Sequence, residues 1–215
     1  MYAVASPPLF HVKHSAGVAA NVSHETMAPL EAYVALLLRW NRTINLISRK
    51  DEEIVWDRHI ADSLALVPIL PADFSHAIDF GSGGGLPGVV LAVATGRPFH
   101  LVESDQRKAV FLREAARITG AHITVHAARA ETVNIPPAPV ITARAAAPLT
   151  VLLGWSARLL APNGICVFPK GRNVEAELTA ATAEWHMNLT SFESPTDPSA
   201  RILRISEIKR VSHAT

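Results

Sequence analysis

Three absences narrow the classes of protein to which this sequence can belong. There is one cysteine, Cys166, so an internal disulfide and a CxxC metal or redox pair are both excluded. No apolar run approaches the roughly 18 residues of a membrane-spanning helix. An excess of one charge is also missing, because 20 lysines and arginines face 19 aspartates and glutamates. We therefore expect a cytoplasmic protein without a membrane segment, in which any contact with RNA comes from a local basic patch.

Hydrophobic residues make up 49% of the 215 positions, which is enough for one domain with a substantial core and short appendages. Residues 1–22 hold Pro7, Pro8 and many small residues but no signal-peptide pattern, and we expect them to form a mobile extension. We divide the rest into a helical segment, residues 23–72, that packs on a core domain, residues 73–215. No HExxH or similar metal-ligand spacing occurs, so we expect no metal; we also expect a monomer.

Hydrophobic periodicity predicts two helices before any strand. Apolar residues recur at spacings of three and four over residues 27–39, which is typical of an amphipathic helix. Ser48, followed three residues later by Asp51, predicts the start of a second helix that ends near Pro68.

Short apolar runs then alternate with helical patterns, which indicates βαβ units, a mostly parallel sheet and an α/β fold. Two last strands have only the turn-rich stretch 194–198 between them, so they should pair antiparallel at one edge of the sheet. The predicted strands are 77–80, 99–103, 123–126, 140–143, 165–168, 187–192 and 201–208, and the predicted helices between them are 88–95, 105–119, 148–160 and 174–184.

The strongest single motif is a glycine-rich loop that directly follows the first predicted strand. Glycines there let the backbone pass close to a bound ligand. Gly83, Gly85 and Gly88 match the dinucleotide pattern GxGxxG, but the glycine run begins earlier, at Gly81, and Asp79 precedes it. The whole frame resembles instead the first motif of S-adenosylmethionine-dependent methyltransferases. A tight strand-to-helix turn without a ligand is the plainer alternative.

An acidic residue at the end of the second predicted strand supports a ligand that contains ribose. The carboxylate of Glu103 could accept hydrogen bonds from both hydroxyls of an adenosine ribose, a device that nicotinamide enzymes share. Asp105 lies two residues further on and could take the same role. Glu103 is our choice because it is nearer the end of the strand.

Several separated motifs, in this order along the chain, resemble the RsmG (GidB) family. The resemblance runs from about Met27 to Lys209. The motifs are Trp40-Asn41-x-x-Ile44-Asn45-Leu46, Arg58-His59-Ile60-x-Asp62-Ser63-Leu64, Gly81-x-Gly83-x-Gly85-Leu86-Pro87-Gly88, Arg129-Ala130-Glu131, Thr142-Ala143-Arg144-Ala145 and Lys170-Gly171.

The resemblance implies a Rossmann-like, seven-stranded class I methyltransferase sheet with two extra N-terminal helices. It also implies that S-adenosyl-L-methionine is the cofactor and that the substrate is N7 of a guanine in the decoding-region loop of 16S rRNA, so that the small ribosomal subunit is the partner. The cofactor-binding residues expected from the glycine loop and from the family are Gly81, Gly83, Gly85, Leu86, Glu103, Ala130, Glu131 and Arg144.

N7 of guanine has an unprotonated lone pair, so its methylation requires no general base. Catalysis can come mainly from holding the reactants in contact and aligned, and we assign no catalytic acid or base. Arg144, Lys170 and Arg172 follow strands at the ligand-bearing edge and are candidate contacts to RNA phosphates. Arg144 could equally brace the cofactor pocket, and the other two could be solvated.

The remaining candidates have plainer explanations. His59, Asp62 and Ser63 share one helical face, and we favour buried hydrogen bonding over catalysis. Asn45 could cap a turn or touch the substrate. The four tryptophans and Cys166 are expected in the core. Basic residues that could form an RNA-binding patch, or simply solvate helix faces, are Arg39, Arg42, Arg49, Lys50, Arg58, Arg107, Lys108, Arg113 and Arg117.

Three other functions remain open from the sequence. A methyltransferase could act on a protein or a small molecule in place of RNA. A nicotinamide-dependent oxidoreductase could use the Gly83-Gly85-Gly88 frame. A non-enzymatic RNA-binding module is a third alternative, although the glycine loop would then have no purpose.

Overall fold

A single seven-stranded sheet in the order β3-β2-β1-β4-β5-β7-β6 forms the centre of the protein. The computed structural model describes residues 24–211, so the extension predicted at 1–22 lies outside the described residues. The first five strands pair in parallel and the last two antiparallel, as the sequence predicts. The strands are β1 (Ala77–Phe80), β2 (Phe99–Val102), β3 (Ile123–His126), β4 (Ala138–Ala143), β5 (Leu160–Lys170), β6 (Trp185–Glu193) and β7 (Arg201–Arg210).

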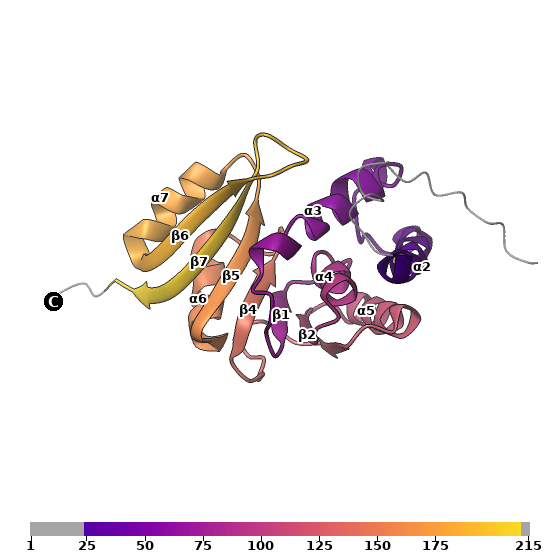
Figure 1. Ribbon diagram of the computed structural model, residues 1–215, viewed down its shortest axis with the longest axis horizontal. Helices are drawn as coiled ribbons and strands as arrows, with labels where there is room; N and C mark the ends of the chain where they lie inside the picture. The colour runs from indigo at the N-terminus through magenta and orange to yellow at the C-terminus, as the bar shows by residue number, and fades with distance from the viewer. Residues whose placement is uncertain (1–23, 212–215) are drawn as a thin grey trace, which may run out of the picture.

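Helices cover the sheet on both faces, so successive strand residues enter two separate hydrophobic cores. In β5, Ile165 and Val167 join the core beneath the N-terminal helices, while Cys166 and Phe168 join the other. Figure 1 shows α2, α4 and α5 toward the β2 end of the sheet and α6 and α7 toward the β6 end. The α-helices are α2 (His24–Asn41), α3 (Ala61–Leu64), α4 (Gly88–Thr95), α5 (Gln106–Thr119), α6 (Leu149–Leu159) and α7 (Val174–Glu184).

The second N-terminal helix differs from the prediction. In place of one helix, residues 49–69 form a 3-10 turn (Arg49–Asp51), a π-helical turn (Trp56–Ile60), α3 and a further 3-10 turn (Val67–Ile69). Ser48 makes no capping hydrogen bond within the part of the chain that the structure describes. The side chain of Asn41 organises the turn instead, because its Oδ1 accepts from the amides of Leu46 and Ile47 at 2.8 and 3.0 Å.

The two ends of α5 follow the expected chemistry. The Asp105 side chain caps α5, and Gly120, in the left-handed conformation, ends it. Within residues 24–211, no helix is long and apolar enough to cross a membrane. Cys166 is buried as expected, and burial raises the pKa of its thiol to about 12.

Candidate active site

A large cavity, of about 1230 Å³, lies where the parallel strands end. The chain that leaves the carboxyl end of each strand from β1 to β5 contributes to its wall, which is where α/β sheets bind ligands. Two more segments close the cavity, one from residues 46–62 and one from the β6–β7 loop. Figure 1 shows this loop and α3 at the same edge of the sheet.

The glycine loop after β1 forms the floor of the cavity. Gly81 and Gly83 line it with φ values of 61° and 53°, a conformation that favours glycine. A Cβ on Gly81 would lie 2.6 Å from the Cβ of Ala146, which belongs to the loop after β4. The hydroxyl of Tyr33 on α2 donates to the carbonyl of Gly84 at 2.5 Å, so the N-terminal helix holds the loop in place.

Gly85, expected to contact the cofactor, is not among the residues that line the cavity. Its φ is 85°, and a Cβ there would lie 2.6 Å from Cγ2 of Val89 and 3.2 Å from the hydroxyl of Tyr33. The structure therefore places Gly85 behind the cavity wall, where close packing requires a glycine. Leu86, the next residue, does line the cavity.

Asp79 lies beneath the same loop and is fully buried. Its Oδ1 accepts a hydrogen bond from the hydroxyl of Thr142 at 2.7 Å, whereas its Oδ2 has no partner among the described residues. Burial raises the pKa of Asp79 to about 6, and the hydrogen bond from Thr142 opposes this shift.

The two acids after β2 have separate roles. Glu103 lines the cavity, and its carboxylate accepts from the amide of Gly83 at 2.8 Å and from the amide of Asp105 at 2.7 Å. Asp105 points to the helix instead, where its Oδ1 accepts from the amides of Arg107 and Lys108. The geometry thus favours Glu103 over Asp105 as the acid available to a ligand.

The loop after β3 brings Ala130 and Glu131 to the cavity, with Ala130 buried and Glu131 exposed. Arg158 on α6 braces this loop from behind, since its guanidinium donates to the carbonyls of Ala130 at 2.6 Å and Val133 at 3.0 Å. Trp155, also on α6, lines the cavity and packs edge-on against Phe80 with a centroid distance of 5.6 Å.

Arg144 directly follows β4 and points to the N-terminal wall of the cavity. Its Nη1 lies 3.6 Å from Oδ2 of Asp62, and its side chain is 17% exposed. Burial raises the pKa of Asp62. Two contacts oppose that shift: the hydroxyl of Thr196, which donates to Oδ1, and the charge of Arg144. Arg144 therefore joins the glycine-loop side of the cavity to the helical segment and the β6–β7 loop.

Lys170 and Arg172 differ in their surroundings. The ammonium of Lys170 donates to the carbonyl of Ala147 at 3.0 Å and to Oε2 of Glu177 at 2.7 Å, and the residue is buried. Arg172 is exposed and is not part of the cavity wall. Of the two, only Arg172 has its charge free to meet a phosphate without giving up an internal partner.

The His59 motif is partly a buried hydrogen-bonding unit, as expected. The hydroxyl of Ser63 donates to the carbonyl of His59 at 2.7 Å. The ring of His59 lies on the cavity wall, with Nε2 3.3 Å from Oδ2 of Asp51. Asp62 accepts a hydrogen bond from the β6–β7 loop. Asn45, the other candidate, is exposed, and it is Asn41 whose side chain accepts the hydrogen bonds of the turn.

Sequence reasoning missed Asp51, Trp155 and the β6–β7 loop as parts of the cavity wall. Asp51 has the pattern of a helix-start acid and Trp155 that of a core residue. The loop carries only turn signals. Nothing in their spacing indicates that the chain brings them to one site.

The family model of GidB, rRNA small subunit methyltransferase G, matches residues 26–198 of this chain. The chain belongs to this family. The ribosomal RNA small subunit methyltransferase G of Granulibacter bethesdensis is 60% identical over 190 residues, which cover 88% of this chain and 89% of that protein. Its counterpart in Gluconobacter oxydans is 51% identical over 190 residues, covering 88% and 98%.

Solved structures agree on the fold at low sequence identity. The N-methyltransferase NodS from Bradyrhizobium japonicum WM9, in complex with S-adenosyl-L-homocysteine, aligns with a TM-score of 0.56 at 15% identity, covering 81% of this chain and 97% of that one. The ribosomal protein L11 methylase from Lactobacillus delbrueckii subsp. bulgaricus gives 0.54 at 15% identity, covering 72% and 78%. The class I methyltransferase fold is thus confirmed. Family membership confirms a methyltransferase that uses S-adenosylmethionine, so the nicotinamide and non-enzymatic alternatives are wrong.

Proposed function

We propose that this protein methylates N7 of a guanine in the decoding-region loop of 16S rRNA. The observation that carries the proposal is the family match over residues 26–198, to a family described as acting on small-subunit rRNA. The two relatives compared above bear the same name and match over nearly their whole lengths. We further propose that the protein works in the cytoplasm as a monomer without a metal ion.

The cavity fits S-adenosylmethionine. Gly81 and Gly83 line the cavity with bare backbone that a ligand can approach closely, and the Glu103 carboxylate keeps unused lone pairs for the hydroxyls of a ribose. Ala130 and Glu131 would enclose the adenine, and Leu86 would pack against the ligand. When bound, the cofactor supplies an electrophilic methyl group carried on a sulfonium.

The remaining residues have to bind and orient the guanine, because its N7 lone pair needs no base to free it. This agrees with the chemistry of the wall, where the His59 ring is neutral at neutral pH: burial, together with the Arg144 charge, lowers its pKa to about 4. Positioning alone can supply a large part of such a rate enhancement.

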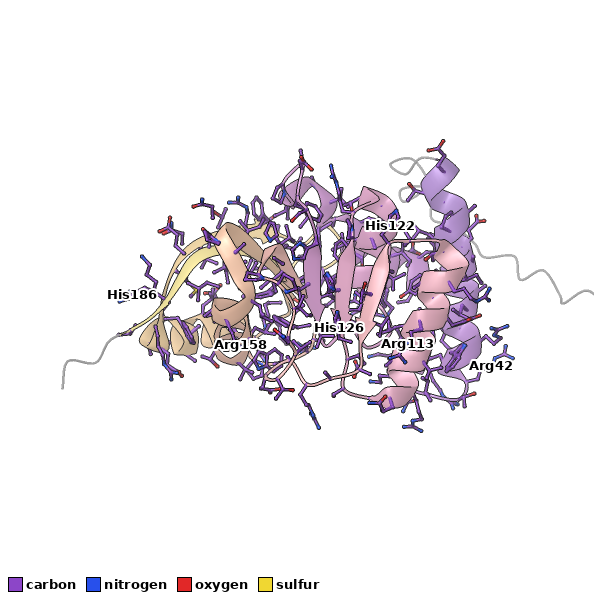
Figure 2. The ribbon with its side chains drawn as sticks, turned by 90° about the horizontal axis from the view of Figure 1, so that it is seen from below. Arg42, Arg113, His122, His126, Arg158 and His186 are labelled. Carbon is purple, nitrogen blue, oxygen red and sulfur yellow. The ribbon has the colours of Figure 1, made fainter. Side chains whose placement is uncertain are left out.

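Basic side chains around the cavity are suited to the phosphates of an RNA loop. Arg58, Lys108 and Arg129 lie on the cavity wall itself. Figure 2 shows Arg113 on α5 and Arg42, the first residue after the neighbouring helix α2, at one end of the molecule. We propose that these cations, with Arg172, contact the RNA backbone.

The test incubates the protein with methyl-tritiated S-adenosylmethionine and small ribosomal subunits from a strain that lacks this gene. Digestion of the 16S rRNA and mass analysis of its nucleosides should place the label in 7-methylguanosine. The variant Gly81→Val should give no label, since its side chain would collide with Ala146. If the wild type binds cofactor but labels no ribosomal RNA, the substrate is a protein or a small molecule and the proposal is wrong.

A further inference from the structure

The cavity has a polar wall in its helical segment, formed by Asp51, Arg58 and His59. The Asp51 carboxylate lies 3.3 Å from Nε2 of His59 and 4.0 Å from Nε of Arg58. Asp51 and His59 are each only 8% exposed. A buried carboxylate held between a neutral ring and a guanidinium is costly to desolvate, so its place in the wall of a ligand cavity calls for a function.

The wall is built on irregular backbone. Asp51 ends a 3-10 turn and His59 lies in the π-helical turn Trp56–Ile60. Turns of this kind occur often at functional sites, because the extra residue turns a side chain toward a direction that a regular helix would not give it. Both ring nitrogens of His59, Nδ1 and Nε2, are buried and have no hydrogen-bond partner among the described residues.

This wall lies close to the glycine loop. The carbonyl of Leu46, five residues before Asp51, would be only 3.1 Å from a Cβ on Gly84. The charge of Arg144, the first residue after β4, acts on the His59 ring as well as on Asp62. A base held against the cofactor loop is therefore within the same cavity as the Asp51 carboxylate.

We propose that the Asp51 carboxylate accepts hydrogen bonds from N1–H and the 2-amino group of the target guanine, and so sets the base specificity of the enzyme. This inference rests on the proposed function. Guanine presents N7 and O6, both acceptors, on one edge and two parallel donors, N1–H and N2–H, on another. When N7 faces the methyl donor, the two donors point away from it and into the cavity. A carboxylate is the side chain that accepts two parallel donors.

His59 and Arg58 act as positioning residues for that carboxylate. The neutral imidazole lies with Nε2 3.3 Å from Oδ2 without forming a regular hydrogen bond, and it does not cancel the negative charge of Asp51 as a cationic ring would. The Oδ1 atom of Asp51 makes no ion pair with the described residues, and Oδ2 keeps a second lone pair beside His59 and Arg58, so each oxygen can accept one of the two donors of the base.

The other two carboxylates in this part of the wall are less suitable. Asp62 already binds Thr196 through Oδ1 and faces Arg144 through Oδ2. Asp57 is exposed and hence well solvated, so a hydrogen bond from a base would replace one from water at little gain. Asp51 alone of the three combines burial with an uncommitted oxygen.

The arrangement discriminates against adenine, the other base that offers an N7. Adenine has an unprotonated N1 and a C–H at position 2, so it would place a lone pair against the Asp51 carboxylate. A buried acceptor left without a donor costs more free energy than a formed hydrogen bond contributes. Adenine should therefore bind much more weakly than guanine at this site.

The experiment compares guanosine with inosine at the target position, because inosine differs only by the missing 2-amino group. Small subunits are assembled with 16S rRNA that carries either nucleoside, and kcat/KM is measured for the wild type and Asp51→Asn. For the wild type we expect kcat/KM to be about 10- to 100-fold lower on inosine, the value of a hydrogen bond to a charged group. For D51N we expect a similar loss on guanosine, and rates on the two nucleosides that agree within about threefold.

The control is Glu53→Gln, an exposed acid of the same segment that is not on the cavity wall and should keep the wild-type ratio. S-adenosylhomocysteine should bind D51N as tightly as the wild type.

Equal rates of the wild type on guanosine and inosine would overturn the inference without any variant. Retained discrimination by D51N would overturn it as well. If D51N does not fold, Asp51→Glu, which keeps the carboxylate, should retain a preference for guanosine. Absence of methylation of guanosine by the wild type would instead contradict the proposed function.

Discussion

At the residue scale, Glu103 joins the glycine loop to the start of α5. Its two carboxylate oxygens accept from the amides of Gly83 and Asp105, so it is held in one orientation before any ligand binds. We expect Glu103→Gln to weaken S-adenosylhomocysteine binding about 10- to 100-fold, because one acceptor oxygen is replaced by a donor and the charge is lost. Isothermal titration calorimetry measures this directly.

Asp105→Asn is the matched control, since it makes the same change two residues away. Asparagine caps helices about as well as aspartate, so the affinity for S-adenosylhomocysteine and the stability of this variant should stay near the wild-type values. A larger loss of affinity in D105N than in E103Q would show that Asp105, not Glu103, binds the ligand.

Asp79 gives a second prediction at this scale, which concerns pH. Its pKa is raised by burial to about 6, from 3.8 in the unfolded chain. The folded state therefore binds a proton more tightly than the unfolded state between these values, and the associated stability is present below pH 4 and lost as the pH rises through 6.

Asp79→Asn removes this titration while preserving the size of the side chain. The free energy of unfolding of the variant, relative to the wild type, should increase from pH 4 to pH 7 by roughly 2–3 kcal/mol. Urea unfolding at several pH values measures the difference. Parallel curves for the two proteins would contradict the raised pKa.

At the scale of elements, Lys170 connects the end of β5 to the loop before α6 and to α7. Its ammonium contacts the Ala147 carbonyl and the Glu177 carboxylate, and Glu177 also accepts from the amide of Leu149. Lys170→Met should lower the free energy of unfolding by about 2 kcal/mol, because a nearly buried charge pair loses one member. Chemical denaturation measures this effect.

Arg172→Met should leave the stability of the protein nearly unchanged and weaken RNA binding instead. Arg172 is exposed, so its loss should change stability by less than about 0.5 kcal/mol. If Arg172 contacts an RNA phosphate, RNA affinity measured at several salt concentrations should show it: the slope of log affinity against log salt should become smaller in magnitude by about one. A large loss of stability in R172M, or none in K170M, would reverse the roles assigned to the two residues.

The elements that the sequence predicts well are those governed by local rules. Asp105 and Gly120 define α5 because capping and the left-handed turn depend on neighbouring residues only. The pattern after Ser48 fails for the opposite reason. The turn after α2 depends on the side chain of Asn41. The carboxylate of Asp51 lies against Arg58 and His59 in the π-helical turn, so contacts between separate segments override the local capping signal.

At the scale of the whole molecule, the cavity combines wall segments from both ends of the described chain. Alternation of strands and helices predicts that the loops after Phe80, Val102 and Ala143 meet at one edge, since parallel strands end there together. It does not predict that residues 46–62 and the β6–β7 loop close the same cavity. Their approach depends on how two helical turns and a hairpin pack in three dimensions.

A hydrogen bond joins these two segments directly: the hydroxyl of Thr196 in the β6–β7 loop donates to Asp62, which lies in α3. Thr196→Val keeps the shape of the side chain and removes the donor. We expect S-adenosylhomocysteine to dissociate about threefold faster, because an exposed hydrogen bond of modest strength no longer holds the loop over the cavity. The amides of the non-proline residues in 194–200 should exchange with solvent faster for the same reason. Stopped-flow fluorescence and hydrogen exchange measure the two effects.

Thr190→Val, the same change at an exposed position of β6, should alter neither. Equal dissociation rates for T196V and the wild type would show that the loop and the helical segment close the cavity independently of each other.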